Sequence, residues 1–301
     1  SARGFLFSDL QAMYVLQAGS AFEVMILSLG LGDRINLIRA RNETLEKEGT
    51  IRAAQLKLIE SEMDIARRIQ LSILPSPREL PGFQIATRFA PMHSVGGDFY
   101  DFYPISKDIL GVLIADVSGH GIPAALIAAM LKIACAEQLA FASRPDLFLS
   151  AVNRAILGKQ AQEFITAGFG VIDREKGTLQ YANAGHPPLL VVSQGQIAHR
   201  LRPFGRPLGL FPDPSIAGTT IPLFEKDRLI FYTDGILEVS NSSGNQFGET
   251  RLEEHILHHR DSSPEELCES LFKLLRSFSG NVEFEDDITL IVVDLDSSRK
   301  G

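Results

Sequence analysis

The sequence predicts an α+β protein with mainly antiparallel sheets, preceded by a long N-terminal helix. From Gly82 to Asp296, short apolar runs alternate with turn-forming residues, and the runs come in groups with helical segments clustered between them. That grouping is typical of α+β domains rather than of repeated strand–helix–strand units. Residues 33–74 contain no proline and only one glycine, which favours one uninterrupted helix. We therefore expect three parts: 1–32, 33–81 and 82–297.

Composition narrows the class of protein. A chain of 301 residues is long enough to bury a substantial core. The formal net charge of -8 argues against nucleic-acid binding, which requires a basic surface. Cys135 and Cys268 lie in apolar, helix-like stretches, and the sequence has no C-x-x-C motif. Two buried free thiols in a reducing compartment are therefore expected, rather than a disulfide or a zinc site.

The first part holds an apolar segment, Ala12 to Leu31, that has roughly the 20 residues of a membrane-spanning helix. Gln17 and Glu23 would be costly at bilayer depth, so a buried helix of a soluble protein is the alternative. Small residues that suit close packing in lipid and arginines that suit a cytoplasmic flank favour the span. These residues are Gly19, Ser20, Ser28, Gly30 and Gly32, followed by Arg34, Arg39 and Arg41.

The second part is charged and helical in character, and it carries a weak heptad pattern. Its apolar row consists of Leu37, Ile51, Leu58 and Ile65, with Thr44 interrupting it. The partner row is mostly polar, so the pattern fits both a solvated connector helix and a dimeric signalling helix. Pro75 and Pro77 are expected to end the helix, because proline cannot continue it.

The third part contains the predicted sheets. Seven runs are typical of strands: FQIATRFA, ILGVLIADV, TAGFGVID, TLQYANA, LLVVS, RLIFYTDG and ITLIVVDL. Four segments are typical of helices: a buried one over Ile122–Phe141, and amphipathic ones over 144–157, 249–259 and 263–278. The last of these begins with Ser263-Pro264, a common helix start.

Four acidic motifs lie far apart in this third part. Each places an aspartate at or near the end of a strand-like run, beside glycine or another turn-former. Carboxylates brought together in this way are the ligands that hard divalent cations such as Mg²⁺ and Mn²⁺ prefer. In isolation, each motif also fits a hairpin turn, a helix-capping loop or a solvated acidic loop. The motifs are VGGDFYDF (95–102), ADVSGHG (115–121), YTDG (232–235) and EDDIT (285–289).

ADVSGHG is the more informative motif when it is taken alone. A strand ends in Asp116, a glycine-rich loop follows, and a helix opens at Ile122 with Pro123 in its first turn. A helix N-terminus presents free N–H groups that hold anions, so an aspartate-bound metal beside it suits phosphate chemistry. In EDDIT, three adjacent acids before a buried strand repel one another unless a cation or solvent screens them.

Taken in order, the motifs resemble the bacterial metal-dependent Ser/Thr phosphatases of the stage II sporulation protein E and RsbU type. These belong to the PPM superfamily and are akin to eukaryotic type 2C phosphatases. The matching segments, between Gln84 and Asp294, are VGGDFYDF, ADVSGHGIPAAL, NAGHPP, GRPLGL, YTDGILE and DDITL. ARRIQLSILP (66–75) is similar to the linker that often precedes this domain. The resemblance implies a four-layer α-β-β-α sandwich with a two-metal site at one edge of the sheets.

The resemblance also implies roles for individual residues. Two Mn²⁺ or Mg²⁺ ions would be held by Asp98, Asp116, the Val117 carbonyl, Asp234 and Asp286, with Asp116 as a bridge and Asp287 behind the ligands. A metal pair lowers the pKa of water, which then attacks phosphorus in line without a phosphoenzyme.

Several other positions are less defined. His120 fits a general acid, but its spacing from Asp116 differs from that in the eukaryotic enzymes. Arg88 fits either a phosphate contact or a surface arginine. Structural roles in loops near the cleft are expected for His186, Gly205, Pro207 and Gly209.

The N-terminal segment YVLQAGSAFEVMILSLGLGDRINLIR resembles the final helix of seven-transmembrane receptors with diverse intracellular signalling modules. The other helices of such a receptor would then precede Ser1. The combined resemblances imply a phosphatase at the inner (cytoplasmic) membrane, with its catalytic domain in the cytoplasm and regulation through a connector helix that forms a homodimer. The implied substrate is a phosphorylated STAS-type anti-anti-sigma factor, with no nucleic-acid partner.

Two other classes of function compete with this one. A receptor output domain that binds a partner without turnover is the first, and the intact metal aspartates argue against it. A nucleotide cyclase is the second, but GGDF lacks the acidic fourth residue of the GGDEF signature.

Overall fold

A computed structural model describes residues 2–75, 82–159, 163–280 and 282–295. The chain divides into two compact units, Ser1–Glu62 and Met63–Gly301. The last turns of the N-terminal helix therefore belong to the same unit as the sheets.

The N-terminal helix, α1 (Ala2–Ile73), runs without a break through both the predicted span and the predicted connector. The prediction of one helix up to Pro75 is confirmed. By length and composition, the described part of α1 could cross a membrane: its most apolar window has a mean hydropathy of 1.5. The apolar side chains described along the first unit, such as Leu37 and Leu58, are exposed.

Two five-stranded antiparallel sheets form the body of the second unit. Sheet A has the order β1 (Phe83–Ala90), β10 (Ile288–Leu295), β9 (Arg228–Tyr232), β6 (Leu189–Ser193) and β7 (Gln196–Leu201). Sheet B has the order β2 (Phe99–Pro104), β3 (Ile109–Val117), β4 (Ile165–Asp173), β5 (Thr178–Ala184) and β8 (Gly218–Pro222). The seven predicted strands are present, whereas β2, β7 and β8 were not predicted.

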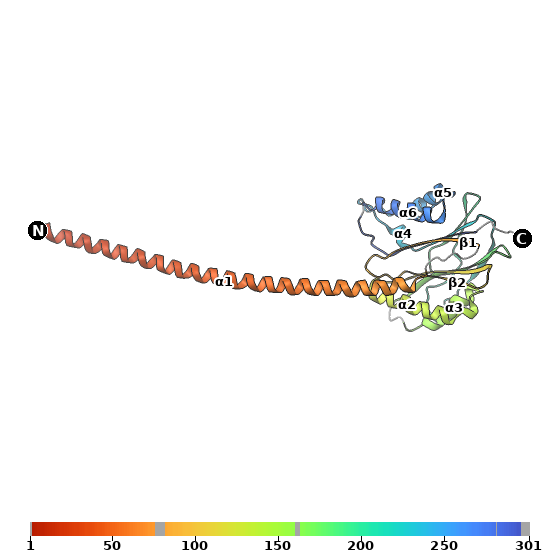
Figure 1. Ribbon diagram of the computed structural model, residues 1–301, viewed down its shortest axis with the longest axis horizontal. Coiled ribbons are helices and arrows are strands. Elements are labelled where there is room, and N and C mark those ends of the chain that lie inside the picture. Colours follow the sequence, from red (N-terminus) through yellow and green to blue (C-terminus); the bar gives the residue numbers. More distant parts are fainter. Residues whose placement is uncertain (1, 76–81, 160–162, 281, 296–301) are drawn as a thin grey trace. The chain divides into compact units, whose positions relative to one another are not determined.

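Helices cover the outer face of each sheet, as the predicted four-layer sandwich requires (Figure 1). The helices α2 (Ile122–Glu137) and α3 (Pro145–Ile156) pack on sheet B, joined by the short helix η1 (Leu139–Phe141). The helices α4 (Gly235–Glu238), α5 (Gly248–His258) and α6 (Pro264–Phe278) lie on sheet A. Ser263 and Glu266 form a capping box at the predicted start of α6, and each side chain there binds the other residue's backbone N–H.

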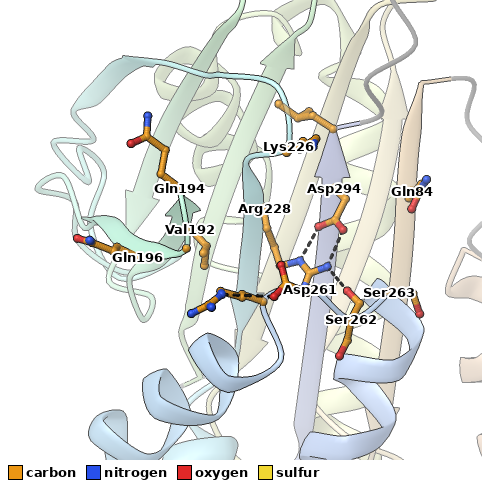
Figure 2. A pocket seen from close by; sticks show the side chains of 13 residues that line it. Gln84, Val192, Gln194, Gln196, Lys226, Arg228, Asp261, Ser262, Ser263 and Asp294 are labelled. Carbon is orange, nitrogen blue, oxygen red and sulfur yellow. Dashed lines mark hydrogen bonds and ion pairs between the residues drawn. The ribbon is translucent and has the colours of Figure 1, made fainter.

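A cavity of about 820 Å³ lies at the end of sheet A where β10 finishes (Figure 2). Arg228 is buried there and forms a two-point ion pair with Asp294, with both nitrogen–oxygen distances 2.6 Å. The same guanidinium donates to the carbonyl oxygens of His259 (3.1 Å) and Ser262 (2.6 Å). Its charge is therefore matched by acceptors, and the cluster ties β9 and β10 to the segment between α5 and α6.

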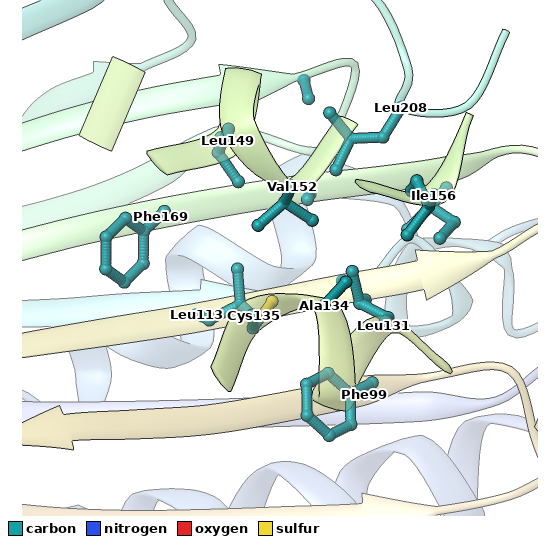
Figure 3. Packing of buried hydrophobic residues seen from close by; sticks show 14 of the residues in the cluster. Phe99, Leu113, Leu131, Ala134, Cys135, Leu149, Val152, Ile156, Phe169 and Leu208 are labelled. Carbon is teal, nitrogen blue, oxygen red and sulfur yellow. The ribbon is translucent and has the colours of Figure 1, made fainter. Parts of the chain in front are cut away.

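The core consists of three apolar layers. On β3, Val112 and Ile114 point between the sheets while Leu113 and Ala115 point towards α2, as strand geometry requires. Figure 3 shows the layer beneath α2 and α3, where Leu113 lies among aromatic rings and Cys135. Cys135 lies in this layer and Cys268 in the layer beneath α6, both buried and free, as predicted.

The topology brings all four acidic motifs to one end of the two sheets. Phe99 pairs with Ala115, so the start of β2 and the end of β3 are neighbours. Tyr232 pairs with Leu290, so the end of β9 and the start of β10 are neighbours as well. Antiparallel pairing thus gathers motifs that lie almost 190 residues apart in the sequence.

Candidate metal centre

Asp98 is the most buried acid at this end of the sheets, with 1% of its surface exposed. Its Oδ2 atom accepts hydrogen bonds from the hydroxyls of Thr233 (2.8 Å) and Thr289 (2.6 Å). Thr289 lies in β10 and Thr233 directly follows β9, both strands of sheet A, whereas Asp98 leads into sheet B, so the contact joins the ends of the two sheets. Burial raises the pKa of Asp98 well above its usual value, and Asp116 raises it further.

Asp116, near the end of β3, shares a region of negative potential with four other acids. Burial raises its pKa to about 7, and Asp234, Asp286, Asp287 and Glu238 add to the shift in that order. Within the described residues, no three His, Cys, Asp or Glu side chains already converge closely enough to hold an ion. The cluster is thus an excess of carboxylates, which a divalent cation would stabilise.

Asp286 and Glu238 face the same region. Burial raises the pKa of the Asp286 carboxyl, Asp234 and Asp287 raise it as well, and His120 counteracts them. Burial followed by Asp234 and Asp286 raises the pKa of Glu238. Glu238 is therefore an additional acid of the site, although the sequence reasoning missed it. Its place in YTDGILE, one helical turn after Asp234, was the available signal.

Asp287 binds the backbone of the glycine-rich loop. Its Oδ1 accepts from the Met92 N–H at 2.7 Å, and its Oδ2 accepts from the Gly97 N–H at 2.5 Å. A side chain at Gly96 would collide with the Asp287 carboxylate, which explains why glycine stands there. Asp287 thus fixes the loop that carries Asp98, and its expected place behind metal ligands stays a prediction.

The backbone of Val117 also lies at this loop. Its N–H reaches the Gly97 carbonyl at 3.4 Å, and a Cβ on Gly97 would lie 2.6 Å from the Val117 carbonyl oxygen. Gly97 therefore leaves room for the Val117 carbonyl beside Asp98 and Asp116.

The last turns of α1 hold the same loop from the other side. Gln70 is 5% exposed, and its amide donates to the Gly96 carbonyl (2.6 Å) and accepts from the Gly96 N–H (3.1 Å). Lys132 of α2 donates to the Ile73 carbonyl at the end of α1 (2.5 Å) and reaches Asp101 of β2 (3.3 Å). The connector helix therefore ends in direct contact with the loop of Asp98.

His120 and Arg88, whose roles the sequence left open, lie in different surroundings. His120 is exposed near Asp286 and stacks edge-on with His93, with ring centres 5.4 Å apart. Arg88 forms a surface ion pair with Glu269 at 2.9 Å, which favours its interpretation as a surface arginine.

His186 is buried, and its Nδ1 lies 2.9 Å from the hydroxyl of Thr166, the strand partner of Asp116. Burial lowers the pKa of this histidine to about 3, so it is neutral in the folded protein. Among the GRPLGL residues, Gly205 lies against the Asn183 carbonyl and Pro207 lies against Gly185. Their expected structural roles are consistent with these contacts.

Comparison with known proteins assigns the sequence to a known family. Residues 106–296 match the family described as stage II sporulation protein E (SpoIIE). Protein IcfG of Synechocystis sp. (strain ATCC 27184 / PCC 6803 / Kazusa) is 31% identical over 261 residues, covering 77% of this chain and 41% of that protein. Phosphoserine phosphatase RsbP of Bacillus subtilis (strain 168) is 28% identical, with coverage of 78% and 58%. This chain thus spans about half the length of these two relatives.

Phosphoserine phosphatase RsbU of Bacillus subtilis (strain 168) is 29% identical over 252 residues, covering 82% of this chain and 74% of that protein. Among solved structures, the SiaA-PP2C domain of Pseudomonas aeruginosa has a TM-score of 0.74 and 25% identity, covering 81% of this chain and 100% of that domain. The RsbU and RsbW domains of Rv1364c from Mycobacterium tuberculosis have a TM-score of 0.62 and 28% identity, with coverage of 72% and 61%.

Proposed function

The chain belongs to the SpoIIE family of protein phosphatases with the type 2C fold, and we propose that it is a metal-dependent Ser/Thr phosphatase that acts on a regulatory partner protein. The observation that supports this proposal is that Asp116 is buried among the repelling carboxylates of Asp234, Asp286 and Asp287 at the end of the sheets where Asp98 also lies. Their mutual repulsion is the electrostatic setting in which a pair of divalent cations binds.

The donor set fits two Mn²⁺ or Mg²⁺ ions. Carboxylates and a backbone carbonyl are hard oxygen ligands, and the surroundings raise the pKa values of three of the carboxyl groups. When bound, such a pair lowers the pKa of water and offsets negative charge on phosphoryl oxygens. The proposed ligands are Asp98, Asp116, the Val117 carbonyl, Asp234 and Asp286.

The other residues of the site orient these groups. Thr233 and Thr289 fix the carboxylate of Asp98 by two hydrogen bonds, so one of its oxygens stays available to a cation. Asp287 holds the backbone of Met92 and Gly97 and keeps the glycine-rich loop against β10. Preorganisation of this kind lets charge stabilisation act without rearrangement during the reaction.

For the substrate, we propose phosphoserine or phosphothreonine on a STAS-type anti-anti-sigma factor. The support is that two relatives are named phosphoserine phosphatases. The test is manganese- or magnesium-dependent phosphate release from such a phosphoprotein by the 301-residue chain, with a doubly substituted Asp116→Asn, Asp234→Asn variant as control. Wild-type activity in that variant would contradict the proposal that these aspartates bind metal ions. Calorimetry that detects no binding of either ion would instead favour a non-catalytic output domain.

We further propose that α1 transmits a signal to the site. Gln70 binds both backbone groups of Gly96, and Lys132 holds the end of the helix, so a shift of α1 would displace the loop of Asp98. In this proposal the N-terminal segment spans the cytoplasmic membrane, the phosphatase domain lies in the cytoplasm, and α1 pairs with a second copy. Sedimentation tests the pairing, and a strict monomer with full, unregulated activity would contradict it.

A further inference from the structure

A second cavity, of about 870 Å³, lies directly beside the candidate metal centre. Its walls come from the last turns of α1, the segment 89–95, Gly121, and the end of α6 with the segment 282–284. All of these belong to the second unit. The cavity is therefore a groove on the phosphatase domain itself.

The groove shares its walls with the loops of the metal centre. Met92 lines it while donating its N–H to Asp287. Val95 lines it and directly precedes the glycines that lead to Asp98, and Phe284 lines it two residues before Asp286. A chain lying in the groove would therefore continue into the space next to the carboxylates.

Part of the lining is apolar. Val282 is 68% exposed, and Phe89, Pro91 and Phe284 are partly exposed. Partly solvated apolar groups in a concave surface favour contact with apolar side chains of a partner, because their removal from water is favourable.

Two arginines stand on different walls of this groove. Arg67 comes from α1 and Arg276 from α6, and both are exposed. In the described ranges, neither side chain forms an ion pair, and the acid that lines the groove is Glu283. In a chain with a net charge of -8, a local excess of cations beside a catalytic centre is complementary to an acidic partner.

From these observations we propose that the groove binds the substrate segment next to the phosphorylated residue and selects segments that carry acidic and apolar side chains. Arg67 and Arg276 pair with the acidic residues, and the apolar lining covers the aliphatic or aromatic ones. This inference rests on the proposed phosphatase function and adds the sequence preference of that activity.

One consequence follows from the position of Arg67 on α1. The substrate contacts the signalling helix itself, so the position of α1 and the affinity for substrate are coupled. Such coupling is reciprocal: a helix position that favours substrate binding is in turn favoured by bound substrate.

The test is phosphate release from three phosphoserine peptides that differ only in their flanking residues, which are acidic, neutral amide or basic. With the full chain and Mn²⁺, we expect kcat/KM for the acidic peptide to exceed that for the neutral one roughly 10-fold, as two partly exposed ion pairs would give. The preference should weaken as salt is raised, because exposed pairs are screened. The Arg67→Glu, Arg276→Glu double variant should reverse the preference and favour the basic peptide.

Lys273→Glu is the matched control for the Arg276→Glu half of the double variant, because it makes the same charge change on α6 outside the groove. It should keep the preference for the acidic peptide. Equal kcat/KM for the three peptides, or an unchanged preference in the double variant, would overturn the groove assignment while leaving the phosphatase function intact. No metal-dependent release from any peptide or phosphoprotein would overturn the proposed function, and the groove assignment with it.

Discussion

Buried charge is paired at one end of sheet A and unpaired at the other end. At one end, Arg228 meets Asp294 and two backbone carbonyls, so its charge and its donors are matched. At the other end, Asp98, Asp116 and Asp286 gather as like charges, and burial and mutual repulsion raise their pKa values. A matched cluster holds a fold together, whereas an unmatched cluster costs stability and is typical of a functional site. The same sheet thus has a paired buried charge at one end and a cluster of like charges, the proposed metal site, at the other.

The largest expected effect concerns the end of the sheets where the aspartates lie. Asp116→Asn removes the proposed bridging ligand, so kcat for phosphate release should fall at least about 1,000-fold, equivalent to roughly 4 kcal/mol of transition-state stabilisation. Because the substitution also removes one of several repelling charges, the thermal unfolding midpoint in chelator should stay the same or rise. An Asp116→Asn variant that loses stability but keeps activity would mean that the aspartates stabilise the fold, which contradicts this comparison.

The next effect concerns the matched end. Arg228→Met leaves Asp294 and two carbonyls without their donor, and breaking a buried pair in this way should lower the free energy of unfolding by about 3–5 kcal/mol. Activity per folded molecule should not change, since the cluster lies at the far end of the sheet from the aspartates. Denaturant unfolding measures the loss.

The double variant Arg228→Met, Asp294→Leu is the control for this prediction. It removes both charges and should recover a large part of the lost stability, because no unpaired charge is left buried. If the single variant is as stable as the wild type, the Arg228 cluster does not hold the strands together.

A third prediction concerns how the free energy of unfolding depends on pH through the buried His186. The pKa of His186 is about 3 in the folded protein against 6.5 for the free side chain, so the unfolded state binds more protons between these values. Stability is therefore full above pH 6.5 and falls as the pH is lowered through that window. The loss from this histidine should be roughly 2 kcal/mol at pH 5. The His186→Gln variant should lack this component when the two proteins are compared by denaturant unfolding at pH 7.5 and pH 5.

Much of the fold could be predicted because its elements carry local signals. Strands such as ILGVLIADV are continuously apolar since both of their faces are buried, and Ser263-Pro264 marks the start of α6. The strands β7 and β8 lie at sheet edges and are short and largely exposed, so their sequences lack the apolar alternation that predicts a strand. The strand β2 pairs along its whole length with β3, although its FYDF sequence was interpreted only as aromatic residues that pack into the core.

The candidate site was predictable only in part, for a physical reason. Aspartates beside glycines at strand ends stand out in a sequence, because few structural roles require them at four places. Residues that orient those aspartates do not stand out. Thr233 and Thr289 act through one hydroxyl each, and Gln70 acts from a helix whose neighbouring residues are solvated. Such contacts depend on which strands and helices meet in space, and that information is not local.

The smallest predicted effect concerns Gln70. It tests whether α1 positions the loop at the end of the sheets that carries the aspartates. Gln70→Ala leaves the N–H and carbonyl of Gly96 without their partners, at a cost of about 1–3 kcal/mol if the loop does not move. Because these two hydrogen bonds tie the loop of Asp98 to α1, we expect the loop to shift and kcat to fall roughly 10-fold. The unfolding midpoint should change little, since the loop relaxes into solvent. Gln55→Ala, at an exposed position of the same helix, is the matched control and should leave kcat unchanged. If the two variants are equally active, α1 ends beside the metal centre without positioning it.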